Sequence, residues 1–392
     1  MTSLSTPITR IRQRLCCLLL AAALAAIAVA VHAAPSDSPH DPQKVDSVMA
    51  QNSIKDYTRQ EIEQLYGAVK PFDADRSAQE LLSSCARWEP PVADPQARRW
   101  YRGATTLNAI AYRTIEQHQQ MLILYEAAAR KGHYQAVKNL TILYSESSLV
   151  RGGRFPAEPE KARAWLHYGL EQRWVGALEW LSTALHEGSA GYVANGQLSL
   201  MYLQKAADLG DPLAQYQVAL IYGNRYKQVE KEEALLQCAA AQVFSAALHD
   251  WGSYNQIDRR VQQALELYQQ AVMAGGSKGG DSAYVLSSAF ANSNTRNQRE
   301  LSTFADPIRK QAYAELKEAL EANDFLRFPR LNEVLPLPPA KVPPWKGIYS
   351  AMSPDDAAYY QNPTPAQELI EDVRRAGLLV SDSYLSQPQR SN

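Results

Sequence analysis

The stretch YLQKAADLGDPLAQYQVALIYG, residues 202–223, decides the fold, because small and apolar residues recur in it at every fourth position. Two earlier stretches keep this spacing, so three frames begin at Leu124, Trp165 and Tyr202, which are 41 and then 37 residues apart. The frames are Leu124, Ala128, Gly132, Ala136, Leu140 and Tyr144; Trp165, Gly169, Arg173, Ala177, Leu181 and Leu185; and Tyr202, Ala206, Gly210, Ala214, Val218 and Tyr222. A helical pattern with a period of about forty residues predicts an all-α solenoid.

Each frame has a physical interpretation as a pair of helices. Alanines such as Ala206 and Ala214 are small enough for two antiparallel helices to approach closely. Gly210 between them is expected to end the first helix in a left-handed cap. The leucines and tyrosines of the frame then fill the groove between neighbouring pairs.

The repeat is less regular in three places. Arg173 stands where the other frames have glycine, and a helix at about residues 229–249 intervenes without the glycine. The stretch ALELYQQAVMAGG at 264–276 opens a fourth, degenerate unit. The glycines from Gly275 to Gly280 predict an extended turn between its two helices.

In residue type and order, these stretches resemble the Sel-one-like repeat, a bacterial relative of the tetratricopeptide repeat. The matching segments are YEAAARKGHYQAVKNLTILY at 125–144, EKARAWLHYGLEQRWVGALEWLSTAL at 160–185 and the stretch at 202–223. The resemblance covers about residues 120–290. It implies a right-handed α-solenoid of antiparallel helix pairs, a fold that usually holds another protein.

Residues 1–33 are predicted to be a signal peptide that directs the chain to the periplasm. Arg10, Arg12 and Arg14 precede an apolar run from Leu15 to Val31, which small residues follow. The run is slightly short for a membrane span, so a membrane anchor is the less favoured alternative. Since the leader holds three basic residues and no acidic one, the rest has 40 − 3 = 37 basic and 41 acidic residues, a formal charge of −4. That balance leaves no basic field to attract nucleic acid.

The rest of the chain divides into five regions in this interpretation. They are a flexible arm at 34–54, an N-terminal helical cap region at 55–118, the Sel-one-like repeat solenoid at 119–292, closing helices at 293–328, and a proline-rich segment with short C-terminal helices at 329–392. In the cap region, helices are expected at about 55–69 and 75–87, and a long helical stretch at about 95–132. Strand signals are nearly absent.

The C-terminal region begins with six prolines between Pro329 and Trp345. Because proline disrupts helices, this segment is predicted to be an extended strap. Two short helices are then expected to act as end caps. Ser353 caps one that has proline at its first position, and Thr364 with Gln367 forms a capping box for the other. The tail is expected to fold onto the solenoid itself.

No catalytic, metal-binding or cofactor-binding motif emerges. The seven histidines include no pair at metal-ligand spacing. The glycines around Lys278 lack the order of a phosphate-binding loop, because Ser277 precedes the lysine. The chain is therefore interpreted as a protein without enzymatic activity, cofactor or metal.

Aromatic residues are the candidate partner contacts. Trp174 and Trp180 fall where the repeat usually carries exposed polar groups, and Trp345 and Tyr349 lie in the tail. Tryptophan and tyrosine are enriched at binding hot spots. Each of the four contacts a partner in one interpretation and packs against a neighbouring element in the other.

Two cysteines remain after the leader, Cys85 and Cys238, which are 238 − 85 = 153 residues apart. An oxidising compartment permits a disulfide between them, but the bond requires their Cα atoms to lie close together. The alternative is two separate, buried thiols.

The size and layout are similar to those of periplasmic immunity proteins that protect bacteria against their own type VI secretion lipases, in particular phospholipase D-like toxins. That resemblance implies an inhibitor that binds its cognate toxin one-to-one and blocks the lipid-binding active site. The rival interpretation is an envelope scaffold for secretion, polysaccharide or signalling machinery. A hydrolase whose site lies outside recognised motifs is a third.

Overall fold

The computed structural model describes residues 56–291, 301 and 305–378, all of which belong to one compact unit, Pro42–Asn392. The predicted signal peptide, residues 1–33, and the predicted arm, residues 34–54, lie outside these ranges.

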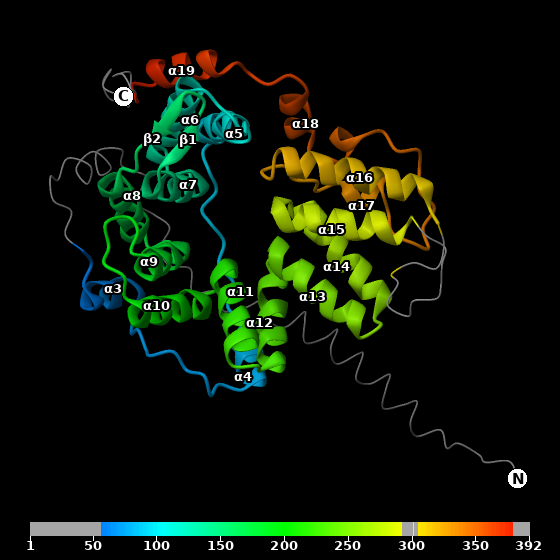
Figure 1. Cartoon of the computed structure of the whole chain (residues 1–392), viewed down its shortest axis with the longest axis horizontal. Coiled ribbons are helices and arrows are strands. Elements are labelled where there is room, and N and C mark those ends of the chain that lie inside the picture. Colours follow the sequence, from blue (N-terminus) through cyan, green and yellow to red (C-terminus); the bar gives the residue numbers. More distant parts are fainter. Residues whose placement is uncertain (1–55, 292–300, 302–304, 379–392) are drawn as a thin grey trace, which may run out of the picture. The chain divides into compact units, whose positions relative to one another are not determined.

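Consecutive helices between residues 115 and 289 form antiparallel pairs joined by tight turns (Figure 1). In the described part of the chain these pairs are α6 (Ile115–Arg130) with α7 (Tyr134–Ser145), α8 (Pro159–Glu171) with α9 (Val175–Glu187), α10 (Gly196–Asp208) with α11 (Pro212–Leu220), α12 (Val229–Ala241) with α13 (Ser245–Ile257), and α14 (Val261–Ala274) with α15 (Gly276–Ala289). A π-helical turn, Ile221–Arg225, extends α11, and a hairpin of β1 (Ser148–Val150) and β2 (Gly153–Phe155) separates α7 from α8. The arrangement confirms the predicted all-α solenoid.

The turn within each of the first four pairs has one residue in the left-handed conformation. Gly132 and Gly210 adopt it with φ of 74° and 98°, as the repeat predicts. Arg173 and Val243 adopt it as well, with φ of 55° and 60°, although side chains disfavour it by about 1–2 kcal/mol. Val243 lies in the turn between α12 and α13, so the expected single helix at 229–249 is wrong. The segment is a full repeat whose turn lacks the glycine.

The glycines at 275–280 do not form the expected extended turn. Only Gly275 lies in the turn, and α15 begins at Gly276. A β-carbon on Gly279 would lie 2.8 Å from the carbonyl oxygen of Ala271 in α14, and one on Gly280 would lie 3.6 Å from Leu320. Gly279 therefore allows α14 to pack closely on α15, whereas a β-carbon on Gly280 would make an ordinary contact.

The N-terminal helices are shorter than predicted. They are α3 (Arg59–Tyr66), α4 (Ala78–Ser83) and α5 (Pro95–Asn108). The expected continuous stretch at 95–132 is also wrong, because it breaks after α5. Thr114 then starts α6 with a capping box, its hydroxyl accepting from Gln117 N, which stabilises a new helix at that residue.

The segment from Tyr57 to Asp94 follows several repeats in turn. The Tyr66 hydroxyl donates to the Trp174 carbonyl oxygen over 3.0 Å, and Asp73 N donates to Gln204 Oε1 over 2.7 Å. Further along, Trp88 N donates to Gln242 Oε1 over 3.1 Å. The segment thus covers the second to fourth helix pairs rather than only the first.

The C-terminal region holds α16 (Pro307–Ala322), α17 (Leu331–Val334), a 3-10 turn (Ile348–Ala351), α18 (Pro354–Gln361) and α19 (Ala366–Arg375). The proline strap is therefore not wholly extended, because α17 forms in a stretch free of proline. Ser353 caps α18 as predicted, accepting from Asp356 N over 3.2 Å. The predicted Thr364 capping box is wrong, since Pro365 occupies the cap position of α19 and no side chain caps that helix.

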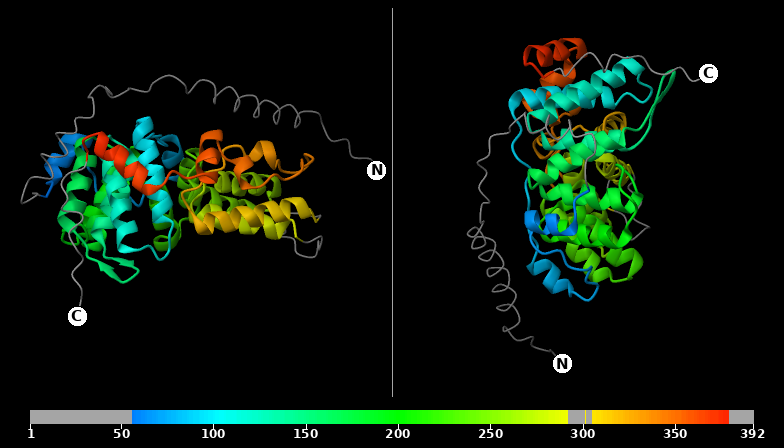
Figure 2. Two further views of the ribbon diagram at one scale, coloured as in Figure 1. Left: turned by 90° about the horizontal axis from the view of Figure 1, so that it is seen from above. Right: turned by 90° about the vertical axis from the view of Figure 1, so that its left-hand side faces the viewer.

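The tail folds back onto the solenoid, as expected. Leu369, Ile370 and Val373 of α19 are buried in the same hydrophobic cluster as the repeats. Figures 1 and 2 show α19 beside α5 and α6, helices far from it in sequence. A second hydrophobic cluster involves α14 to α18.

Candidate partner-binding groove

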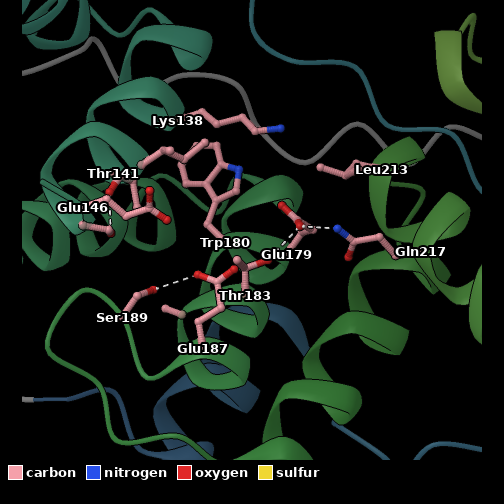
Figure 3. A pocket seen from close by; sticks show the side chains of 13 residues that line it. Lys138, Thr141, Glu146, Glu179, Trp180, Thr183, Glu187, Ser189, Leu213 and Gln217 are labelled. Carbon is pink, nitrogen blue, oxygen red and sulfur yellow. Dashed lines mark hydrogen bonds between the residues drawn. The ribbon is translucent and has the colours of Figure 1, made fainter. Parts of the chain in front are cut away.

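The second helices of the first three pairs, α7, α9 and α11, enclose an open pocket of about 310 Å³ (Figure 3). Its lining comprises Lys138, Thr141, Ile142, Ser145, Glu146, Glu179, Trp180, Thr183, Ala184, Glu187, Ser189, Leu213 and Gln217. This volume lies at the lower end of the range of about 300–1,000 Å³ for small-molecule sites. It suits one long side chain better than a large ligand.

Glu179 carries the only deeply buried carboxylate of this lining, at 4% exposure. Its Oε1 accepts two hydrogen bonds, from the Thr183 hydroxyl over 3.0 Å and from Gln217 Nε2 over 2.9 Å, as Figure 3 shows. Both donors are neutral. Among the described residues, Glu179 has no ion-pair partner, and its Oε2 accepts no hydrogen bond.

A second carboxylate, Asp211, lies near Glu179 at the start of α11. Its Oδ1 accepts from Ala214 N over 2.8 Å, which caps the helix. Burial and, to a smaller extent, the negative charge of Glu179 raise the pKa of Asp211 from 3.8 to about 6, while Lys138 opposes this effect. The floor of the pocket is therefore a region of negative potential.

Trp180 forms one wall of the pocket and joins an aromatic cluster behind it. The Tyr134 ring lies 5.1 Å from the Trp180 ring and 5.4 Å from the Trp174 ring, and Tyr168 lies 5.7 Å from Trp174. Trp174 and Trp180 are each 5% exposed. Both therefore pack against neighbouring helices, the second of the two interpretations given above, since the first and second pairs bury them. Trp180 alone of the two lines the pocket.

A second pocket of about 740 Å³ adjoins the first along α9, α10 and α11. The two pockets share Thr183, Glu187 and Gln217. Together they form one surface feature, called here the α7–α9–α11 groove. Adjoining pockets on packed helices are the kind of surface with which solenoids bind proteins.

Trp345 and Tyr349 lie apart from this groove, in the second hydrophobic cluster or at its margin. Trp345 is half-buried, and its Nε1 donates to Glu315 Oε2 over 2.6 Å. Tyr349 is 37% exposed. The four aromatic candidates therefore do not form one site, and a role in partner contact remains a proposal for each.

Cys85 and Cys238 are joined by a disulfide, with their Cα atoms 5.7 Å apart. The bond attaches the segment after α4 to α12. Gln215 Nε2 adds a hydrogen bond to the Ala86 carbonyl oxygen over 2.9 Å. Of the two cysteines, Cys238 is buried, whereas Cys85 is exposed at the surface.

Sequence reasoning missed Glu179, Asp211 and Gln217. Asp211 before Pro212 has the pattern of a helix start, and Thr183 follows Glu179 by four positions. Neither signal reveals burial, because the pocket arises only where three helices from different repeats meet.

The described residues contain no group of three or more His, Cys, Asp or Glu side chains placed to hold a metal ion. Within the same ranges, every helix is too short or too polar to cross a membrane.

The fold and groove define a Sel-one-like helical-repeat protein, and comparisons with known proteins agree. The chain is 30% identical to Pseudomonas aeruginosa PA5086, over 69% of this chain and 96% of that one, with a TM-score of 0.50. It is 28% identical to the P. aeruginosa immunity protein Pa5087, over 65% and 94%, with a TM-score of 0.51. The chain belongs to the family of Sel-one-like repeat proteins to which PA5086 also belongs.

Two further comparisons concern the C-terminal region and curated sequences. Residues 282–383 match a family described as a domain of unknown function (DUF6396). This range holds α16 to α19 and thus Trp345 and Tyr349. No curated protein matches the chain.

Proposed function

We propose that this chain is a periplasmic immunity protein that binds and inhibits a cognate type VI secretion lipase. The observation that carries the proposal is the 28% identity to the immunity protein Pa5087 over 94% of that protein. The similarity covers 65% of this chain as well, so it is not confined to a single repeat unit. The phospholipase nature of the toxin rests on the overall resemblance of the sequence.

The groove supports binding rather than catalysis. Its floor holds Glu179, whose hydrogen bonds come from neutral groups. The lining of the pocket of about 310 Å³ contains no histidine or cysteine, the residues that most often act as base or nucleophile. A stable complex buries about 1,200–2,000 Å² in total, more than the two pockets alone provide. We therefore expect the toxin to cover the groove and flanking repeat surface, and the bound chain to block the lipid-binding active site.

The test is an affinity purification of the tagged chain from the periplasm of its own host, followed by mass spectrometry. A secreted lipase recovered one-to-one, and encoded beside the gene of this chain, is the expected result. Recovery of resident envelope machinery without a lipase contradicts the proposal. That outcome supports the rival role, an envelope scaffold.

A further inference from the structure

The carboxylate at the floor of the α7–α9–α11 groove has no cation paired with it among the described residues. Glu179 is only 4% exposed. Burying a carboxylate is unfavourable unless a cation or a full set of hydrogen-bond donors compensates its charge. Thr183 and Gln217 satisfy Oε1, while Oε2 accepts no hydrogen bond from any described residue. Oε2 is not itself a fully buried atom, so the structure leaves one carboxylate oxygen without a donor among the described residues and accessible from the pocket.

The charges around this oxygen favour a cation from outside. Asp211 adds a second buried carboxylate nearby, and the exposed Glu146 and Glu187 line the same pocket. Lys138 is the one basic residue of the lining, and it has no ion pair among the described residues. Three lining carboxylates and Asp211 thus outweigh a single lysine, and the potential attracts positive charge.

The walls distinguish between kinds of cation. Trp180 offers an aromatic surface, and Ile142, Ala184 and Leu213 offer apolar contacts for an aliphatic stem. Arginine has a planar guanidinium that pairs with carboxylates and stacks on aromatic rings, whereas the lysine ammonium is compact and strongly hydrated. The lining therefore matches arginine better than lysine.

We propose that this pocket receives an arginine side chain of the protein partner, with the guanidinium at Glu179 and the stem along Trp180. The inference rests on the proposed function in one respect, because the arginine is taken to belong to a bound partner protein. The arginine would be the main anchor of the interface with the partner, in keeping with the enrichment of arginine at binding hot spots.

The first test uses the full exported chain, purified from the periplasm, and two probes of matched shape. N-acetyl-arginine amide carries the guanidinium, and N-acetyl-citrulline amide replaces it with a neutral urea. We expect the arginine probe to bind at about 1–10 mM and to shift the NMR signals of the pocket residues, since small probes gain little affinity. The citrulline probe should bind at least about tenfold more weakly. Equal binding of both probes, or of neither, overturns the proposal.

Three variants with opposite expected effects keep the test independent of folding. Glu179→Gln retains acceptors for Thr183 and Gln217 but removes the charge, so binding of the arginine probe should fall at least about tenfold. Lys138→Ala removes the competing cation and should strengthen binding about twofold or more. Glu230→Gln neutralises an exposed carboxylate outside the lining and should change nothing.

Stability measurements separate lost binding from lost structure. Because Glu179→Gln removes a buried unpaired charge, the variant should unfold at the same temperature as the unaltered chain or a higher one. A variant that unfolds normally yet binds the probe like the unaltered chain overturns the proposal. Stronger binding by Lys138→Ala has no explanation in damage to the fold.

The same variants separate this inference from the proposed function. If the chain binds the arginine probe but no lipase toxin, the pocket stands and the immunity role fails. If the chain binds a lipase and Glu179→Gln changes neither toxin nor probe affinity, the immunity role stands and the arginine pocket is overturned. If both stand, Glu179→Gln should weaken toxin binding at least about thirtyfold, since a buried charge pair loses one partner.

Discussion

Leu369 of α19 lies directly against Gly103 of α5, in the space that a side chain at residue 103 would take. A β-carbon on Gly103 would lie 2.3 Å from Leu369 Cδ1. Around this contact, Arg99 forms ion pairs with Glu368 and Asp372, each over 3.2 Å. The absence of a side chain at residue 103 therefore allows α19 to pack against α5, beside the first helix pair of the repeats.

Gly103→Ala should weaken this packing and lower the free energy of unfolding by about 1–3 kcal/mol, because the added methyl overpacks the contact. Denaturant unfolding measures the loss. Gly196→Ala is the matched control, since Gly196 is also helical and a β-carbon there meets nothing within 4 Å. With Leu369→Ala as background, the cost of Gly103→Ala should shrink. Equal effects of the two glycine substitutions would contradict this account of the contact.

Breaking the disulfide should destabilise the chain by about 2–5 kcal/mol, because the bond restricts a long segment of the unfolded state. Cys85→Ser, Cys238→Ala and the double variant should lose similar amounts, since any one of them removes the same bond. Denaturant unfolding with and without reductant provides the measurement. Reductant should have no effect on the variants, and an additive double variant would contradict the bond.

The stability of the chain should fall as the pH drops from 6.5 toward 4. Burial lowers the pKa of His118, His133 and His167 from 6.5 to about 4, so the unfolded chain takes up protons in this range that the folded chain does not. Asp211 acts in the opposite direction, because its pKa is raised from 3.8 to about 6 and the folded state holds its proton longer. Because three histidines lower the stability and one aspartate raises it over this pH range, the free energy of unfolding should fall overall. Melting temperatures at pH 7.5 and 5 test the sign.

His167 offers a residue-specific form of this test. His167 Nε2 is hydrogen-bonded with the Tyr192 hydroxyl over 2.6 Å, and an amide can keep that bond. His167→Gln should therefore fold and should show a smaller loss of melting temperature between pH 7.5 and 5. An unchanged or steeper pH dependence would show that His167 does not contribute.

Trp174 should matter for stability rather than for direct binding. Trp174→Ala removes a ring that is 5% exposed and contacts Tyr134 and Tyr168, so the free energy of unfolding should drop by about 3–5 kcal/mol. Tyr349→Ala, at a residue 37% exposed, should cost less than about 1 kcal/mol. Comparing both with toxin affinity shows whether Tyr349 belongs to the interface. A stable Trp174→Ala protein would contradict the packing described for this cluster.

The sequence predicts the solenoid well because small residues and left-handed glycines mark its helix pairs. Gly132 and Gly210 show the rule. Val243 shows where this rule fails. A β-branched residue takes the left-handed position there, so the sequence lacks the glycine that would mark the turn of that repeat. The glycines at 275–280 show the opposite failure. Their composition resembles an extended turn, yet only Gly275 lies between the helices, and Gly279 serves the close packing of α14 on α15.

The groove is less predictable than the fold. Its composition depends on which faces of α7, α9 and α11 meet, and the burial of Glu179 follows from that meeting rather than from neighbouring residues. Trp180 shows the same difficulty, because its position suggests exposure and the neighbouring pair covers it. Residue type identifies candidates, and only tertiary contacts decide among them.

The most direct measurement of the central claim is a titration of the purified chain into its purified cognate lipase, with phospholipid hydrolysis as the readout. A tight one-to-one inhibitor predicts that hydrolysis falls in proportion to added chain and vanishes at equimolar concentration. Hydrolysis that persists unchanged at molar excess of the chain would contradict the immunity function.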